Sequence, residues 1–198
     1  MNEKDEKCQF IAALEATGRA NVDKVIAGLE ELGFFTAPAS TRFHGSYPGG
    51  LLRHSLNVLI EARVIREAQI RLRPELAAKL PEDGVVIAAL LHDVCKAEVY
   101  KKTEKFKRGA NGWEKYSGYN VDYSDLPLGH GEKSVVRLLR WGLSLTDDEI
   151  LAIRWHMHAF DMPSSNEASG CFSAATAKCP LLAVLIAADG LASRLLEG

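Results

Sequence analysis

The chain has 198 residues, of which 47% are hydrophobic and 25% are charged, and its formal net charge is −2. A chain of this length and balance can bury one hydrophobic core, and its charge does not by itself call for nucleic acid or an anionic membrane as partner. The longest apolar runs have seven and eight residues, too few for a membrane-spanning helix. The four cysteines form no C-x-x-C pair and no signal peptide is recognisable, so we expect a soluble protein of the reducing cytoplasm.

Apolar residues of the first seventy positions recur at intervals of three and four, which is typical of helices. This spacing predicts three helices, which run over 3–17, from an N-cap at Asn21 to a stop at Gly33, and over 51–70. The side chains expected to face the core are Cys8, Ile11 and Leu14 in the first helix and Leu52, Leu56, Ile60 and Val64 in the third. Residues 34–50, rich in proline and glycine, are predicted to form an ordered loop.

A fourth helix should begin near Gly84, with Asp83 as its cap. Its sequence VVIAALLHDVCKA is apolar nearly all round, which is typical of a helix buried at the centre of a domain. The segments predicted to follow it are an excursion over 99–128 with a loop or a β-hairpin around 109–112, a helix over 131–141, a helix opened by a capping box at 146–149, a loop over 161–178, and a last helix from Pro180 to about 196.

These segments predict an all-α protein, a compact bundle of six or seven helices with a small loop or hairpin excursion. We expect a single domain over 1–198, in which the helices of 1–35 precede a core formed by 36–198.

Three ionisable residues lie in strongly apolar helical sequence. His92 and Asp93 directly follow VVIAALL, and Asp189 follows LLAVLIAA. A buried carboxylate without a partner is costly, so metal binding is favoured for this set over a helix cap or a salt bridge. Further candidates stand on other predicted elements, at His54, His130 and His156. Helical bundles build metal sites in this way, from imidazoles and carboxylates of several helices.

The chain resembles the HD-domain superfamily of metal-dependent phosphohydrolases over about residues 38–197. The resemblance is carried by GGLLRH at 49–54, LLHDVCK at 90–96, GHGEKS at 129–134, AIRWHMH at 152–158 and AADG at 187–190. In that family the first His, the H-D pair and the last Asp bind one metal, which implies the set His54, His92, Asp93 and Asp189.

Family members with two metals add two histidines between the H-D pair and the last Asp, and the H-D aspartate bridges the metals. The matching positions are His130 and His156. His158 is an alternative to His156, but two residues apart on a helix point about 200° away from each other, so only one of them can face the site. We prefer His156, which matches the position of the family's ligand.

Imidazole and carboxylate ligands together suit Mn, Fe, Co, Ni or Zn, and we expect two such ions. The resemblance implies hydrolysis of a phosphoester or phosphoanhydride of a small nucleotide-like substrate by metal-activated water. Asp93 and Lys96 are the expected catalytic residues. The side chains expected to contact the substrate are Arg53, Lys96, Lys133 and His44, although a solvated role or a salt bridge is open for each basic one.

The stretch 101–108, KKTEKFKR, carries five basic residues and one acidic residue, and aromatic residues follow it. Such a mixture suits contact with a nucleotide or a single strand, and a solvated hairpin is the other interpretation.

Other functions remain open. Some binuclear HD proteins are di-iron oxygenases with the same ligands, and degenerate HD modules bind nucleotides without catalysis; a helical interaction module without metal is a further possibility. HD-domain exoribonucleases look similar around GGLLRH, so an RNA or DNA end is a possible substrate. A small nucleotide is favoured over a polymer, because the chain has no room for a separate nucleic-acid domain, and over a cyclic dinucleotide, because the G-Y-P sequence of that branch is not found.

Overall fold

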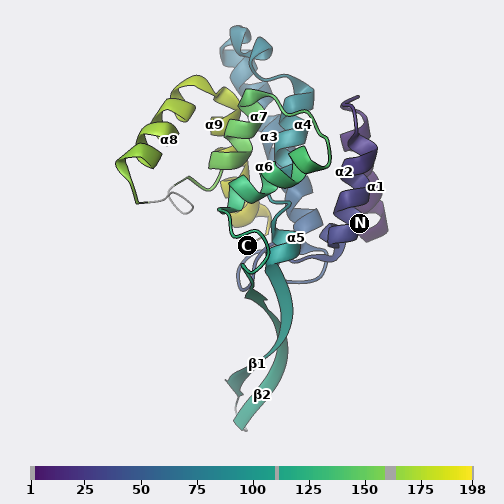
Figure 1. Ribbon diagram of the computed structural model, residues 1–198. Coiled ribbons are helices and arrows are strands. Elements are labelled where there is room, and N and C mark those ends of the chain that lie inside the picture. Colours follow the sequence, from purple (N-terminus) through teal and green to yellow (C-terminus); the bar gives the residue numbers. More distant parts are fainter. Residues whose placement is uncertain (1–2, 110–111, 159–163, 198) are drawn as a thin grey trace.

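The computed structural model describes residues 3–109, 112–158 and 164–197, which form a bundle of helices from which one β-hairpin projects (Figure 1). The predicted all-α bundle with a hairpin is confirmed. Its helices are α1 (Glu3–Glu15), α2 (Val22–Leu32), α3 (Gly50–Leu72), α4 (Glu82–Leu91), α5 (Lys96–Val99), α6 (His130–Arg140), α7 (Asp147–Trp155), α8 (Asn166–Lys178) and α9 (Pro180–Leu191). Shorter turns are η1 (Phe34–Thr36), η2 (Pro74–Ala78) and the π-helical η4 (Ala192–Leu196), and the strands are β1 (Tyr100–Gly109) and β2 (Gly112–Val121).

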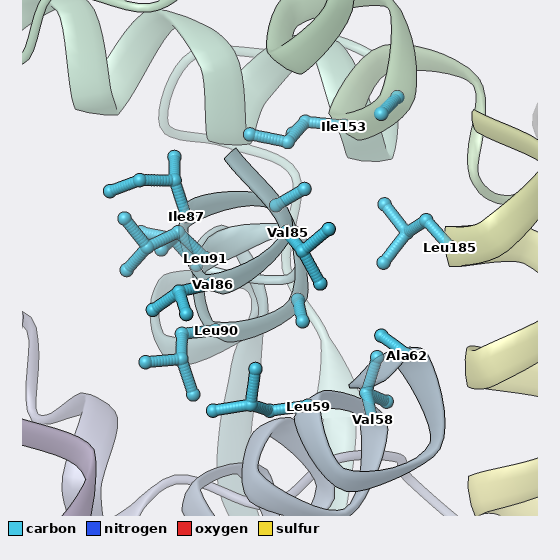
Figure 2. Packing of buried hydrophobic residues seen from close by; sticks show 14 of the residues in the cluster. Val58, Leu59, Ala62, Val85, Val86, Ile87, Leu90, Leu91, Ile153 and Leu185 are labelled. Atoms are coloured by element: carbon cyan, nitrogen blue, oxygen red, sulfur yellow. The ribbon is translucent and has the colours of Figure 1, made fainter. Parts of the chain in front are cut away.

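Helix α4 lies at the centre of the bundle, as its apolar sequence predicts. Every residue from Gly84 to Leu91 is buried, and α1, α3, α7 and α9 pack against this helix. Figure 2 shows Leu59 of α3, Ile153 of α7 and Leu185 of α9 on different sides of it. Burial of each large apolar side chain contributes roughly 1.5–3 kcal/mol. The polar residues that follow α4 are therefore held in the dry centre of the protein.

Helix α3 turns a different face to the core from the one predicted. Leu52 is buried and Leu56 partly buried, but Ile60 and Val64 are more than half exposed. Steps of four residues advance about 40° beyond a full turn, so a stripe with this spacing drifts off the core. The buried residues are instead spaced by one, two or three positions, which keeps them on one face of the helix. They are Leu51, Leu52, His54, Ser55, Val58, Leu59 and Ala62, after Gly50 at the start of the helix. In α1, similarly, Cys8 is exposed, because Phe10 and Leu14 face the core.

Two predicted helix caps have other roles. Helix α4 begins at Glu82, so Asp83 lies within its first turn, where its Oδ2 accepts a hydrogen bond of 2.9 Å from Arg19 Nε. Asn21 stands at the N-cap of α2 with φ 63°, but its amide donates to the carbonyl oxygen of Gly142. In both cases a tertiary contact takes the side chain that would have capped the helix.

Other helix ends follow the prediction. Gly33 ends α2 with φ 72°, and Thr146 with Glu149 forms the capping box of α7. Pro180 stands in the first turn of α9. The predicted fourth helix divides into α4 and α5, because a turn at 92–95 interrupts it.

The predicted loop over 161–178 is wrong from Asn166 onward, because these residues form α8; residues 161–163 lie outside the described residues. The side chain of Ser165 accepts a hydrogen bond from the backbone of Ala168 and caps the helix. Alanine, frequent in this segment, has the highest helix propensity. Only Ala175 of α8 is buried, so the sequence of this segment has no apolar stripe from which a helix could be predicted.

The hairpin extends away from the bundle (Figure 1). Its strands are antiparallel, with Tyr100 opposite Val121 at the base and Gly109 opposite Gly112 at the far end. The turn residues 110–111 lie outside the described part of the chain. This arrangement confirms the predicted hairpin around 109–112.

No single helix among the described residues is both long and apolar enough to cross a membrane. Helices α8 and α9 with η4 meet the requirement only as a joined pair, which is bent by 101°. All four cysteines are free, so burial of the core rather than disulfide bonding stabilises the fold.

Candidate metal centre

Asp93 lies at the centre of a group of histidines, and its two carboxylate oxygens face different members of the group. Oδ2 lies 3.2 Å from Nε2 of His92 and 3.5 Å from Nε2 of His54. Oδ1 lies 2.7 Å from Nε2 of His130 and 3.4 Å from Nε2 of His156. One carboxylate thus stands between two pairs of imidazoles, which is the arrangement expected of a bridging ligand.

Asp189 completes the group. Its Oδ1 lies 3.2 Å from Nε2 of His54. Within the described residues, the six predicted ligands form three overlapping sets, each within 4.8 Å: His54, His92 and Asp93; His92, His156 and Asp189; and Asp93, His130 and His156. A fourth set joins His54 to His44 and Glu197. The structure therefore brings all six predicted metal ligands together, from α3, α6 and α9 and from the ends of α4 and α7. His158 belongs to none of these sets.

Two of the imidazoles are oriented by the helices that carry them. His92 follows the last residue of α4, and its Nδ1 donates to the carbonyl oxygen of Ala89 at 2.9 Å. His156 follows α7 in the same way, with Nδ1 at 2.8 Å from the carbonyl oxygen of Ile153. With the proton on Nδ1, each Nε2 presents its lone pair to the centre.

The third imidazole is oriented by a carboxylate that the sequence analysis missed. Nδ1 of His54 lies 3.2 Å from both oxygens of Glu197, whose side chain is buried. Asn57, one turn after His54 on α3, donates a hydrogen bond of 2.9 Å to the same carboxylate. No sequence pattern links Glu197 to His54, although the spacing of Asn57 from His54 places both on one face of α3.

Two glycines allow the helices to meet at the centre. A Cβ at Gly50 would collide with the carbonyl oxygen of Gly45, so only glycine lets the preceding loop cross the start of α3. A Cβ at Gly131 would collide with the carbonyl oxygens of Ile153 and Arg154. The close contact between the start of α6 and the end of α7 brings His130 and His156 to the same carboxylate oxygen.

Four polar atoms of the centre are buried without a hydrogen-bond partner among the described residues. They are Nε2 of His54, His92 and His156 and Oδ2 of Asp93, and the last of these atoms forms an ion pair with Lys96. Each of the three Nε2 atoms lies 3.2–3.5 Å from an oxygen of Asp93. Buried polar atoms are rarely left in this state, and nitrogen with carboxylate oxygen is the donor set that divalent transition metals prefer. The residues therefore fit a metal.

The charges of the centre are strongly coupled. Burial disfavours the charged form of His54, but the carboxylates of Asp189, Asp93 and Glu197 outweigh it and raise the pKa of His54 to about 10. Against the same burial, Cys95 and Asp93 raise the pKa of His130 to about 10. Both imidazoles therefore hold a proton at neutral pH in this arrangement, and a cation that binds them must displace it.

Lys96 is buried beside the centre, with Nζ 2.5 Å from Oδ2 of Asp93. Burial opposes its charge, but Asp93 raises the pKa of Lys96. The pKa of Asp93 lies well below its usual range, since Lys96 and His92 outweigh the cost of burial. Lys96 thus keeps its proton and balances the buried carboxylate.

A cleft of about 490 Å³ opens beside the centre, and its lining includes His130, Lys96, Tyr100 and Tyr123. His44 lines it too, with its ring centroid 5.0 Å from that of His54 and its Nε2 buried without a partner within the described residues. The cleft gives a substrate access to the side of the centre that includes His130.

The other two residues predicted to contact substrate lie differently. Lys133 lines the cleft, but it is only 2% exposed and its Nζ lies 2.5 Å from Oε1 of Glu98. Arg53 does not line the cleft, and its guanidinium pairs with Glu6 on α1. Both cations therefore form ion pairs within the protein, with Glu98 and with Glu6.

Comparison with known proteins adds one relative. A dihydroneopterin 2′,3′-cyclic phosphate phosphodiesterase of Methanocaldococcus jannaschii is 28% identical over 160 residues, which are 81% of this chain and 56% of that protein. The chain thus spans little more than half the length of this relative. No protein-family profile and no solved structure matches the chain. The fold and the centre define a helical protein suited to binding divalent metals, and this protein is similar to a phosphodiesterase.

Proposed function

We propose that this protein is a metal-dependent phosphohydrolase of the HD-domain superfamily, which cleaves a phosphoester or phosphoanhydride of a nucleotide-like substrate. The observation that carries the proposal is the buried carboxylate of Asp93, with imidazoles on both of its oxygens and a cleft beside it. The relative is named for a 2′,3′-cyclic phosphate, so cyclic phosphodiesters belong among the candidate substrates.

We propose that residues 1–198 form a single domain, because one hydrophobic cluster extends from α1 to η4. We place it in the reducing cytoplasm, which suits four free cysteines.

Two ions are proposed. The first would be held by His54, His92, Asp93 and Asp189, and the second by Asp93, His130 and His156. Bound divalent metals would lower the pKa of a water molecule and offset the negative charge of the phosphoryl oxygens.

Hydrolysis forms a bond from the oxygen of water to phosphorus, breaks the bond from phosphorus to the leaving oxygen, and transfers a proton to that oxygen. Lys96 retains its proton, so its ammonium group serves to hold a phosphoryl oxygen in the cleft. Burial and the positive charges of His54 and Lys96 lower the pKa of His44, so its imidazole is neutral at pH 7. Its Nε2 is the atom proposed to orient the substrate and to exchange a proton with it.

The proposal is tested by removing metal with a chelator and restoring Mn, Fe, Co, Ni or Zn one at a time. Hydrolysis of bis(p-nitrophenyl) phosphate and of a nucleoside 2′,3′-cyclic phosphate is then measured for the wild type and for Asp93→Asn. Asp23→Asn, which changes an exposed carboxylate on α2, is the control. We expect activity that requires metal and Asp93 but not Asp23. No metal uptake, or equal activity of Asp93→Asn, would contradict the proposal. Oxygen consumption with iron in place of hydrolysis would favour the di-iron oxygenase.

A further inference from the structure

The hairpin of β1 and β2 is basic in an otherwise acidic protein. Residues 100–121 contain six Lys or Arg and two Glu, a net charge of +4. Since the whole chain has a net charge of −2, the remaining residues carry −6. Lys101, Lys102 and Arg108 have no carboxylate within ion-pair distance in the described chain, so their charges are available to a partner. A polyanion is the partner that this concentration of charge fits.

Strand pairing places the two most exposed aromatic side chains of the hairpin, Phe106 and Trp113, on one face, while Tyr116 lies on the other face opposite Lys105. Opposite residues of an antiparallel pair share a face, and every second residue of a strand returns to it. Phe106 is opposite Lys115, and Arg108 is opposite Trp113, so these four side chains lie together near the far end. Trp113 is 75% exposed and Phe106 is 63% exposed. Lys115 pairs with Glu104 on the same face, so Arg108 is the cation that this end offers to a phosphate. The two exposed rings beside Arg108 form a surface on which unpaired bases can stack.

The same face runs back to the cleft. Every second residue of β1 from Phe106 toward the bundle lies on this face, namely Glu104, Lys102 and Tyr100. Tyr100 lines the cleft, as Lys96 does. Tyr123, just after β2, lines the cleft as well. A strand of ten residues is roughly 33 Å long. The face is therefore long enough for several nucleotides, and one end of it opens at the candidate metal centre.

We propose that this face of the hairpin, from Trp113 and Phe106 to Tyr100, binds single-stranded RNA and leads its end into the cleft. The inference rests on the proposed phosphohydrolase function and makes its substrate the end of an RNA rather than a free nucleotide. Single-stranded RNA suits the surface better than a duplex, because only unpaired bases expose their faces to Phe106 and Trp113. The 2′-hydroxyl of RNA is also the group that allows a terminal 2′,3′-cyclic phosphate.

Binding is measured by fluorescence anisotropy of a labelled RNA of about 12 nucleotides, with the full chain at about 50 mM salt. The test variant is Arg108→Ser with Trp113→Ser. Its matched control is Arg71→Ser with Leu72→Ser, which removes one cation and one exposed apolar side chain at the end of α3. We expect the test variant to weaken binding about tenfold or more and the control to change it less than about twofold. Equal binding by the two variants, or no binding by the wild type, would overturn the inference.

Two further measurements separate this inference from the proposed function. Asp93→Asn should no longer hydrolyse bis(p-nitrophenyl) phosphate but should still bind the RNA. The variant with Arg108→Ser and Trp113→Ser should hydrolyse this ester as the wild type does but should no longer bind the RNA. Hydrolysis of the small ester without RNA binding would overturn the RNA surface alone. The converse result is a protein that binds RNA through the hairpin but hydrolyses neither bis(p-nitrophenyl) phosphate nor the cyclic phosphate with any metal. That result would overturn the proposed function and support the RNA-binding surface. A hairpin variant that differs from the wild type only in oligomeric state would show that the face binds a second copy instead.

Discussion

The carboxylate of Glu197 lies 3.2 Å from Nδ1 of His54, although the two residues are 143 positions apart in the chain. The contact fixes the imidazole so that its Nε2 faces Asp93 and Asp189. A carboxylate behind a ligating histidine both orients the ring and makes it a stronger ligand. Glu197 is therefore a positioning residue of the proposed first metal site.

Replacement of Glu197 should weaken metal binding without removing a ligand. We expect Glu197→Ala to lower affinity for the first ion about 10- to 100-fold and Glu197→Gln to lower it less, because the amide oxygen still accepts a hydrogen bond. Competition with a chromogenic chelator measures the affinity, and Glu167→Gln on exposed α8 is the control. Unchanged affinity in Glu197→Ala would mean that the contact has no role in binding.

The number of bound ions should depend on His130 and His156 but not on His158. We expect elemental mass spectrometry of the reconstituted wild type to find about two ions per chain. His130→Ala and His156→Ala should each reduce this to about one, because each removes a ligand from the side of Asp93 Oδ1. His158→Ala, which alters a histidine outside the ligand sets, should retain both ions. Two ions in all three variants would contradict the binuclear arrangement.

Metal binding should release protons at neutral pH. Carboxylates raise the pKa of His54 to about 10, and Cys95 with Asp93 raises that of His130 to about 10, so both are charged in the metal-free protein at pH 7. A metal binds the neutral ring, so its affinity should rise with pH up to about pH 10. Because the pKa of each imidazole is higher in the folded protein than in the unfolded chain, these contacts stabilise the metal-free fold fully below about pH 6.5. Their stabilisation decreases as the pH rises to about 10. Calorimetry in buffers with different ionisation enthalpies counts the protons, and binding heats that do not depend on the buffer would contradict the prediction.

The stability of the bundle should depend on Arg19, which joins α4 to α7. Its guanidinium pairs with Asp83 and with Glu149, and the side chain of Glu149 is almost fully buried. Arg19→Ala leaves that carboxylate without an ion pair, with the backbone N–H of Thr146 as its remaining hydrogen-bond donor, and should lower the free energy of unfolding by about 3 kcal/mol. Arg73→Ala removes a comparable pair with Glu75 that is exposed on both sides, and should cost less than about 1 kcal/mol. Urea denaturation compares the two variants, and equal losses would show that burial of Glu149 is not the cause.

Local pattern was sufficient to predict the helices that carry the centre. The apolar sequence of α4 requires burial on all sides, and this places His92 and Asp93 in the interior whatever packs around them. A buried acid next to a histidine already favours metal binding, and the resemblance supplied the remaining ligands. That these residues bind metal stays a prediction, while their convergence is a property of the fold. Helix α8 was missed for the same local reason, since it buries almost nothing and so has no stripe.

Contacts between distant residues were decided by the tertiary structure alone. Which oxygen of Asp93 faces which imidazole depends on how closely α6 approaches α7 at Gly131. Whether Lys133 is available to a substrate depends on Glu98, which pairs with it from α5. The position of Tyr100 at the cleft likewise depends on where α5 ends and the hairpin leaves the bundle. By itself, the sequence determined that α4 is buried on all sides, because its residues are apolar all round, but it did not determine the core face of α3, where Ile60 and Val64 are exposed. Partners and directions across the bundle needed the packed structure, because no periodicity connects residues as far apart as His54 and Glu197.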